Sequence, residues 1–266
     1  MTSARDILQQ FGAVESDQRY GRLLDMFTDD AVYCDPIMGV QSGREQIASF
    51  MAEMEKVVPK MGIVFDDWVT VADTSVGWAT WNMVVPTDAG PMPVPGQSLY
   101  RLRDSKVCYV ADYLDSRVFA KVNPKASLDF HAAARAPKGT TSAGPAADLV
   151  RTFWSLQNSA RYSELAALFT HDAVFTDQVY GRFDGHAAVS AYLQRMETEM
   201  PEGGMSFSLV DHAGDDTVAW SQWVCHMPGG DIPGWTLHTV RDGRFTLDAD
   251  YFDVMAARAA SRNDAS

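Results

Sequence analysis

The stretch RYGRLLDMFTDDAVYCD (residues 19–35) recurs as RYSELAALFTHDAVFTD (residues 161–177), 142 positions later. The same offset holds without a gap over residues 19–86, where 21 of 68 positions are identical. After a four-residue deletion the offset becomes 138, and PGQSLYRLRDSKVCYVADYLD (residues 95–115) aligns with PGWTLHTVRDGRFTLDADYFD (residues 233–253). Two copies of one module predict two domains of the same fold.

The domain organisation follows from the length and from the segment between the copies. The chain of 266 residues is long enough for two domains of ordinary size. The intervening segment is rich in Ala, Pro, Gly, Ser and Thr, a composition typical of a flexible connection. We therefore expect a first domain at residues 1–122, a linker at 123–144, a second domain at 145–258 and a tail at 259–266.

Composition and charge limit the possible partners. The chain is 46% hydrophobic and 21% charged, as in a folded domain, and its net charge is −13. Such a charge repels nucleic acid and anionic lipid, and no apolar run approaches the roughly 18 residues of a membrane span. The cysteines, Cys34, Cys108 and Cys225, lack the spacing of a disulfide framework or a zinc site. We expect a soluble cytoplasmic protein.

The spacing of apolar residues gives the order of elements in each module. Helical spacing covers residues 6–14 and 20–27, a short β-prone segment follows at 31–35, and a third helix is predicted at 47–59. Alternation with period two then predicts an antiparallel meander with strands at 64–73, 76–85, 97–103 and 107–114. The sequence therefore predicts an α+β fold, with the third helix closing the concave side of a curved antiparallel sheet.

This order of elements, together with FTDDAVYCDP (residues 27–36), resembles the nuclear transport factor two-like family, also called SnoaL-like. The segment DDAVYCDP is similar to ketosteroid isomerases, whereas RDGRF (residues 241–245) followed by Asp250 is similar to the SnoaL polyketide cyclases. The resemblance covers both modules and implies two tandem cone-shaped α+β barrels. The same fold serves isomerases, cyclases, dehydratases, epoxide hydrolases and binding modules.

Asp35 and its counterpart Asp177 are the first candidate catalytic residues. Tyr33 and Asp35 share one face of their strand, and the resemblance to the isomerases places that face in the cavity, with Asp35 and Asp177 as general bases. A carboxylate beside an apolar wall is suited to taking a proton next to a carbonyl. An aspartate at a strand end is also a common turn cap, and both interpretations stay open.

A second recurring carboxylate lies within the last strand, at Asp112 and Asp250. Aspartate is unfavourable inside a strand of β-forming residues, which favours a functional role over an exposed edge charge. The resemblance to the SnoaL cyclases places their catalytic aspartate close to this position and implies a working histidine at His238. Pairing around Ile232 predicts that His226 lies opposite His238 and forms with it an acid–base couple that titrates near neutral pH.

The remaining expectations concern the ligand. Strand parity predicts that Trp78 and Trp220 point inward, where they would bind substrate together with Tyr33, Tyr100 and His226. An aromatic cavity with few carboxylates favours a small hydrophobic substrate, aromatic or polycyclic. The sequence has no phosphate-binding or dinucleotide-binding glycine motif and no histidine spacing typical of metal sites, so we expect no cofactor and no metal.

These observations favour a cofactor-independent acid–base enzyme of the isomerase, lyase or cyclase type. A tandem module that only binds a hydrophobic ligand or a protein is the alternative, and in a third interpretation one copy is active and the other is a scaffold. We also expect an intrachain pseudo-dimer, in which apolar outer sheet faces containing Phe245, Leu247 and Tyr251 pack together. Further homo-oligomers stay open.

Overall fold

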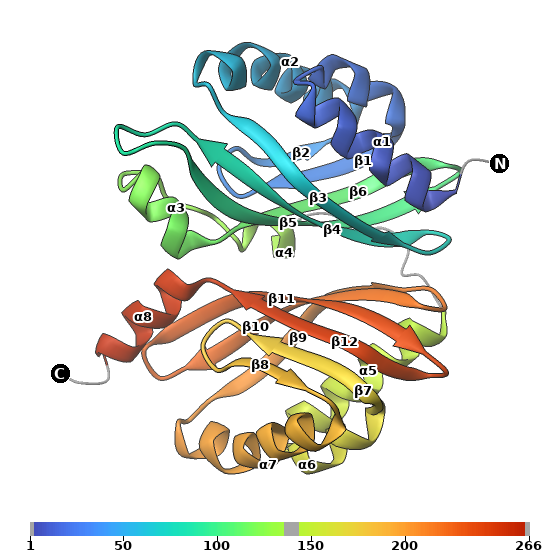
Figure 1. Ribbon diagram of the computed structural model, residues 1–266, viewed down its shortest axis with the longest axis vertical. Helices are drawn as coiled ribbons and strands as arrows, with labels where there is room; N and C mark the ends of the chain where they lie inside the picture. The colour runs from blue at the N-terminus through green and yellow to red at the C-terminus, as the bar shows by residue number, and fades with distance from the viewer. Residues whose placement is uncertain (1–2, 136–143, 264–266) are drawn as a thin grey trace. The chain divides into compact units, whose positions relative to one another are not determined.

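The computed structural model describes residues 3–135 and 144–263, and Figure 1 shows their elements. The chain divides into two compact units, Met1–Thr140 and Thr141–Ser266. Residues 136–143 of the predicted linker and residues 264–266 of the predicted tail lie outside the described residues. No described helix is long and apolar enough to cross a membrane.

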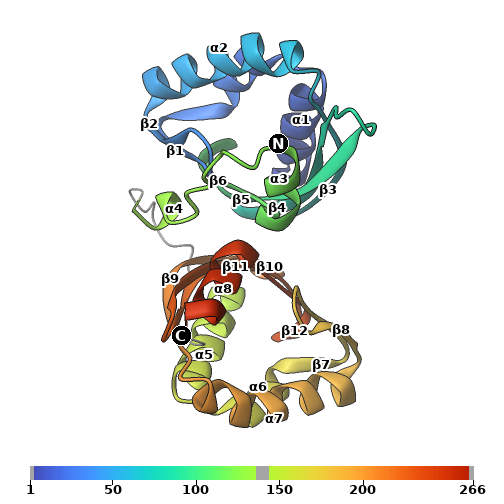
Figure 2. The same cartoon turned by 90° about the vertical axis from the view of Figure 1, so that its left-hand side faces the viewer.

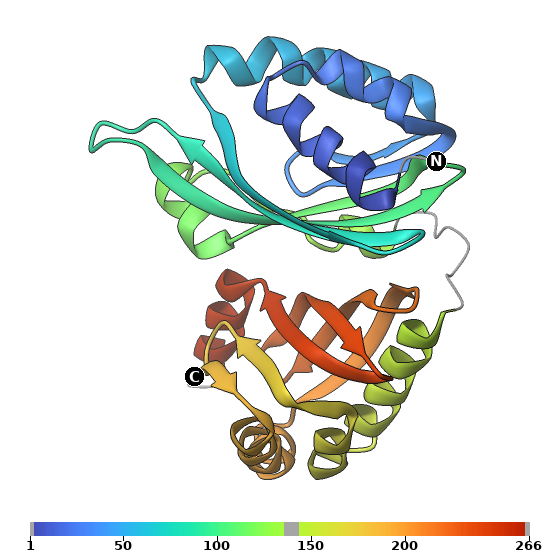
Figure 3. The same cartoon turned by 45° about the vertical axis from the view of Figure 1, so that its right-hand side comes forward.

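The first unit is built from one sheet whose concave side is covered by the two longest helices of the unit (Figures 1 and 3). Its elements are α1 (Ala4–Ser16), a 3-10 helix (Tyr20–Met26), β1 (Phe27–Asp35), β2 (Gly39–Ser42), α2 (Arg44–Lys60), β3 (Val64–Ala72), β4 (Val76–Val85), β5 (Met92–Arg103), β6 (Lys106–Leu114), α3 (Ser116–Val122) and α4 (Ala132–Arg135). The strand order is β2-β1-β6-β5-β4-β3.

The second unit repeats this arrangement. Its elements are α5 (Pro145–Asn158), α6 (Tyr162–Leu165), a 3-10 helix (Ala166–Leu168), β7 (Phe169–Asp177), β8 (Gly181–Asp184), α7 (His186–Glu202), β9 (Ser206–Gly214), β10 (Val218–Met227), β11 (Gly230–Arg241), β12 (Arg244–Phe252) and α8 (Val254–Asn263). The strand order is β8-β7-β12-β11-β10-β9. The α+β class and the two tandem copies are confirmed, although α8 occupies part of the predicted tail.

Two details of the predicted sheets are wrong. The sheets are mixed, because β1 pairs parallel with β6 and β7 pairs parallel with β12. The long connection between β1 and β6, which includes α2 and three strands, permits a parallel pairing that a hairpin cannot make. The sheets are also open and not barrels, because β2 and β3 form opposite edges of the first and β8 and β9 those of the second.

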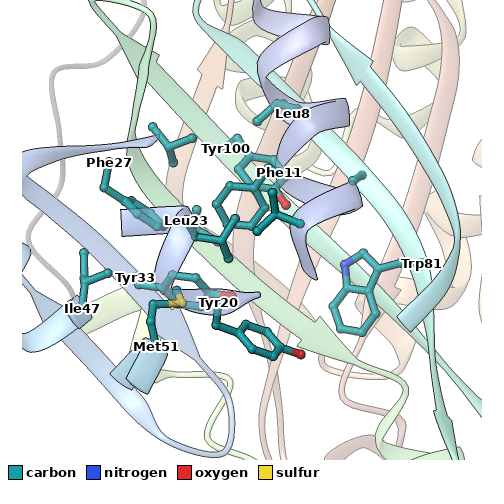
Figure 4. Close-up of a cluster of buried hydrophobic side chains, with 14 of the residues drawn as sticks. Leu8, Phe11, Tyr20, Leu23, Phe27, Tyr33, Ile47, Met51, Trp81 and Tyr100 are labelled. Carbon is teal, nitrogen blue, oxygen red and sulfur yellow. The ribbon is translucent and has the colours of Figure 1, made fainter. Parts of the chain in front are cut away.

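Helices fill the concave side of each open sheet (Figure 2). In the first unit, Leu8 and Phe11 of α1 and Ile47 and Met51 of α2 meet strand residues in one buried cluster, part of which Figure 4 shows. The Ser3 hydroxyl and the Asp6 carboxylate form a capping box that fixes the start of α1. The helices therefore hold the interior of the unit against the inward face of the sheet.

Glycines opposite tryptophans shape the inward face. Gly96 pairs with Trp81, and Gly234 pairs with Trp223 at the same place in the second unit. A Cβ atom on either glycine would lie 2.3 Å from the indole ring of its tryptophan. The absence of a side chain therefore lets each indole ring lie flat against the neighbouring strand, on the concave face.

Candidate active site

The second unit encloses a cavity of about 270 Å³ between its helices and the inward sheet face. The wall is mainly aromatic and aliphatic, and it includes four methionines. The lining residues used below are Trp154, Gln157, Tyr162, Phe175, Asp177, Val179, Tyr180, Tyr192, Trp223 and Asp250. Val179 and Tyr180 are 63% and 39% exposed, so the β7–β8 turn lies at the mouth of the cavity.

A chain of hydrogen bonds across three strands holds Asp250 at this wall. The Trp223 Nε1–H donates to Thr236 Oγ1 at 2.8 Å, and the Thr236 hydroxyl donates to Asp250 Oδ1 at 2.6 Å. The register aligns Thr236 with Asp250 on neighbouring strands, so the chain follows directly from the sheet. Asp250 Oδ2 accepts no hydrogen bond from the described residues, and Asp250 lines the cavity.

The environment of Asp250 favours its protonated form. Burial raises the pKa of its carboxyl well above the ordinary value, and the nearby charge of Asp248 raises it further. The hydrogen bond from Thr236 lowers the pKa, and the charge of Asp177 raises it again. Asp250 is thus a carboxyl group at the cavity wall whose ionised form is disfavoured by burial.

Asp177 and Asp35 cap turns, as one of the two sequence interpretations proposed. Asp177 Oδ1 accepts from the backbone N–H groups of Val179 and Tyr180 at 2.6 and 2.8 Å. Asp35 Oδ1 accepts in the same way from residues 37 and 38, both at 2.7 Å. Asp177 also borders the cavity, where its Oδ2 lies 3.4 Å from the Tyr192 hydroxyl. A role in the turn therefore does not exclude a role at the site.

In the first unit both oxygens of the equivalent Asp112 are engaged. The Tyr33 hydroxyl donates to Oδ2 at 2.5 Å, and the Ser98 hydroxyl donates to Oδ1 at 2.6 Å. The Trp81 Nε1–H in turn donates to Ser98 Oγ at 2.8 Å. Burial raises the pKa of Asp112 to about 7, and the two hydrogen bonds oppose that shift. Tyr100 lies in the buried hydrophobic cluster that also contains Tyr33 and Trp81.

His238 lies deeper than predicted. It is fully buried, its ring stacks on Phe245 at 4.9 Å, and its Nδ1 lies 3.1 Å from Asp248 Oδ2. Ser221 Oγ lies 3.2 Å from its Nε2. Burial lowers the pKa of His238 to about 3, so the expectation that it titrates near neutral pH is wrong.

The predicted pairing of His226 with His238 is also wrong. The hairpin turns at residues 227–230, so His226 pairs with Asp231 while His238 pairs with Ala219. His226 is 40% exposed and lies 2.8 Å from both Asp231 Oδ1 and Ser208 Oγ. The PGG sequence at residues 228–230 forms a tighter turn than the pairing around Ile232 assumed.

The inward faces carry different residues from those expected. Trp81 and Trp223 belong to the two buried clusters and reach the Asp112 and Asp250 networks, so Trp78 and Trp220 lie on the opposite faces of their strands. Gly96 and Gly234, which lie opposite Trp81 and Trp223, are the sequence signal that could have placed these two tryptophans on the inward face. Phe245, predicted on the outer face, stacks on His238 because a β-bulge shifts the register between residues 245 and 247.

Comparison with known proteins places this geometry in a family. The SnoaL-like domain model matches residues 8–110 and 150–247, one match in each unit. The chain belongs to the SnoaL-like family. The two matches together cover most of the chain, and the resemblance inferred from residues 27–36 and 241–250 is confirmed.

Three solved structures that are similar to this SnoaL-like chain each cover less than half of it. An NTF2-like protein of unknown function from Mesorhizobium loti is 21% identical, with a TM-score of 0.37, and the match covers 44% of this chain and 97% of that one. A candidate polyketide cyclase from Xanthomonas campestris pv. campestris has the same identity and TM-score, with coverages of 44% and 96%. A candidate ketosteroid isomerase from Kribbella flavida is 23% identical, with a TM-score of 0.36 and coverages of 41% and 77%. No curated protein matches this sequence.

Proposed function

We propose that the second unit is an acid–base enzyme that moves a proton on a small hydrophobic aromatic substrate, with Asp250 as the proton acceptor. The observation that carries this proposal is the free Oδ2 of Asp250 at the wall of an apolar cavity. Burial raises the pKa of this carboxyl group, which makes its ionised form a stronger base than an ordinary aspartate. The family resemblance supports an isomerase, lyase or cyclase.

The proton transfer follows from the position of the carboxylate. Asp250 in its ionised form takes a proton from a carbon next to a substrate carbonyl: the C–H bond breaks, the proton goes to Oδ2, and the electron pair moves to the carbonyl oxygen. Where a C=C bond of the substrate is conjugated with this enolate, the electron pair returns from the oxygen, the C=C bond shifts, and the proton goes from Oδ2 to the far carbon, which completes an isomerisation. Thr236 holds Oδ1 throughout, so Oδ2 stays directed at the reacting carbon. The transfer changes no oxidation state, and we propose a reaction without a cofactor.

The size of the cavity narrows the substrate class. A volume of about 270 Å³ lies near the lower limit of the roughly 300–1,000 Å³ of small-molecule sites, which favours one or two rings over a larger polycyclic skeleton. The aromatic rings of Phe175, Tyr192 and Trp223 offer flat apolar contacts. Asp177, which follows the Thr176–Ala249 pair on β7 beside Asp250, and the Tyr192 hydroxyl of α7 are the candidates for polar contacts.

The test is the exchange of the α-hydrogens of α-tetralone, a bicyclic aromatic ketone, for deuterium in D₂O, followed by NMR. The wild-type protein should accelerate exchange, and Asp250→Asn should lose roughly the 10²–10⁴-fold that a general base contributes. Asp242→Asn is the matched control, because Asp242 lies in the exposed β11–β12 turn with φ of 53°, where asparagine is well tolerated. Equal exchange by wild type and Asp250→Asn would rule out the proposal.

A further inference from the structure

A second cluster of polar side chains in the second unit is separate from the cavity. Ser208 of β9, His226 of β10 and Asp231 of β11 come from three neighbouring strands. Ser208 Oγ lies 2.8 Å from His226 Nε2, and Asp231 Oδ1 lies 2.8 Å from His226 Nδ1. These three residues form the Ser208 triad. A hydroxyl on one ring nitrogen and a carboxylate on the other is the arrangement that activates a serine nucleophile on several unrelated folds.

Strand alternation places the triad on the sheet face that is turned away from the cavity. Each of its members has a neighbour in the chain that lines the cavity, namely Phe207, Cys225 and Ile232. Successive side chains on a strand point to opposite faces, so the triad points outward. The side chains of His226 and Asp231 are 40% and 55% exposed, and Ser208 is exposed as well. A molecule in solution can therefore reach the serine hydroxyl.

The contacts of His226 decide which of its ring nitrogens carries the proton. A carboxylate only accepts hydrogen bonds, so in the neutral imidazole Nδ1 carries the proton and donates to Asp231. Nε2 then presents its lone pair to the Ser208 hydroxyl, which donates to it. The lone pair is thus directed at the proton that must leave Ser208 when the serine oxygen attacks a carbonyl carbon.

The first unit has no counterpart of the triad. The corresponding positions hold Asp66, Val84 and Pro93. The first unit forms the same three neighbouring strands, as β3, β4 and β5, with these different side chains. The fold therefore does not require a serine, a histidine and an aspartate at these positions, and their combination in the second unit needs another reason.

The edge of the sheet offers donors for the charge that a serine attack creates. β9 is the last strand of its sheet, so alternate backbone N–H groups beside Ser208 point away from β10. Attack on an ester places an electron pair on the carbonyl oxygen, which an N–H group can stabilise. Exposed side chains offer little contact area for a long acyl chain. The triad therefore fits a small acyl group on a good leaving group, such as a phenol.

We propose that the Ser208 triad hydrolyses small aryl esters through an acyl-serine. Ser208 Oγ bonds to the carbonyl carbon, its proton goes to His226 Nε2, and the electron pair of the C=O bond moves to the carbonyl oxygen. When that pair returns, the bond to the aryl oxygen breaks, and the phenol leaves with the proton from Nε2. Water then attacks the acyl-serine in the same way and releases the carboxylic acid. Asp231 is a positioning residue that holds the imidazole in the required tautomer.

The first test is the hydrolysis of 4-nitrophenyl acetate by the full chain, with mass spectrometry of peptides from samples quenched early. We expect an acetyl group on Ser208 and a rate that falls at least about tenfold in Ser208→Ala. Ser206→Ala is the matched control, because Ser206 is exposed and lies directly opposite His226, whereas the hydrogen bond to the ring comes from Ser208. Equal rates in wild type and Ser208→Ala would show that the imidazole acts alone and would overturn the proposal, as would acetyl groups found only on other residues.

A second comparison separates the positioning role of Asp231 from a structural one. In Asp231→Asn the amide can donate to Nδ1 and hold the other tautomer, so acetylation of Ser208 should slow at least about tenfold. Asp231→Glu keeps a carboxylate acceptor and should retain most of the rate. Both variants should keep the Tm of the wild type, because Asp231 is exposed. An unchanged rate in Asp231→Asn, or an equal loss in the two variants, would contradict the positioning role. Neither test involves Asp250, so its result is independent of the proposed function.

Discussion

The Tyr33 hydroxyl donates a 2.5 Å hydrogen bond to Oδ2 of Asp112, whereas no side chain in the described part of the chain donates to Oδ2 of Asp250. In each unit, the ring at the position of Tyr33 packs against a second aromatic ring, which comes from the long helix after the first two strands. The rings of Tyr33 and Phe50 lie 5.1 Å apart, and those of Phe175 and Tyr192 lie 5.0 Å apart. The hydroxyl has moved from one ring to the other, and the carboxyl of Asp250 is uncovered as a result.

Restoring the hydroxyl should therefore cover Asp250. In Phe175→Tyr, the new phenol can donate to Oδ2 of Asp250 as Tyr33 does to Asp112, which stabilises the carboxylate and lowers its pKa. We expect the exchange of α-tetralone to fall at least about tenfold, part of the effect of losing a general base. NMR exchange rates of the variant and the wild type test this, and an unchanged rate would show that Oδ2 is not the acceptor.

The reciprocal change, Tyr33→Phe, should act in the opposite direction on Asp112. The Tyr33 hydrogen bond lowers the pKa of Asp112, so its loss should raise that pKa above about 7. The measurement is a ¹³C NMR titration of the aspartate carboxyl signals, with Asp112→Asn for assignment. A pKa that falls or stays constant would mean that the short contact does not favour the carboxylate.

Thr236 links Trp223 to Asp250, so its loss leaves two buried groups without partners. Thr236→Val keeps the shape of the side chain but removes the acceptor for the indole N–H and the donor to Oδ1. We expect the free energy of unfolding of the second unit to fall by about 1–3 kcal/mol, and the pKa of Asp250 to rise. Urea unfolding measures the first effect. Thr152→Val, on the exposed side of α5, should change stability much less.

The fold was largely predictable because it depends on patterns that the repeat presents twice. Helical spacing at residues 47–59 predicted α2, and alternation predicted the strands after it, within a few residues of their observed ends. β2 was missed, since its four residues are too few to show a period. The parallel pairing of β1 with β6 could not be read from either strand alone, because it depends on a long connection.

The position of the site was predictable in part. Asp112 and Asp250 interrupt β-forming strands, and that local conflict indicated them correctly as inward-facing carboxyls. The face of the tryptophans was not predictable by alternation alone, because a shift of one residue reverses every side chain on a strand. The opposing pairs Gly96 with Trp81 and Gly234 with Trp223 carry the information that alternation lacks.

The buried histidine could not be understood from its sequence position. Val110 and Tyr100 occupy in the first unit the places of Asp248 and His238 in the second, so the pair that can form an ion pair is present in the second unit alone of the two. Full burial, which depends on Phe245 and the bulge beside it, decides the protonation of His238. The sequence pattern of a strand indicates which face a side chain is on, but not how far that side chain is buried from solvent.

His238 should stay neutral throughout the range in which ordinary histidines titrate. Burial lowers its pKa to about 3, so its ring signals in ¹H–¹⁵N NMR should not move between about pH 5 and 8. Because the unfolded chain binds this proton below about pH 6.5 and the folded chain binds it only near pH 3, stability falls as pH drops from about 6.5 to about 3. His238→Gln should remove this part of the acid sensitivity. A His238 signal that titrates near pH 6.5 would contradict full burial.

Asp112 should have the opposite effect on stability. Its pKa is about 7 in the folded protein and near 3.8 in an unfolded chain, so between these values the folded state binds more protons than the unfolded state. The contribution of Asp112 to stability is therefore complete at low pH and falls as pH rises from about 4 to 7, by at most about 1.4 kcal/mol per pH unit. Asp112→Asn cannot titrate, so the difference in stability between wild type and variant should shrink over this range. Amide hydrogen exchange in β5 and β6, compared between the two proteins at the same pH, reports this difference for the first unit alone. A difference that is constant from pH 4 to 7 would show that Asp112 titrates as an ordinary exposed aspartate.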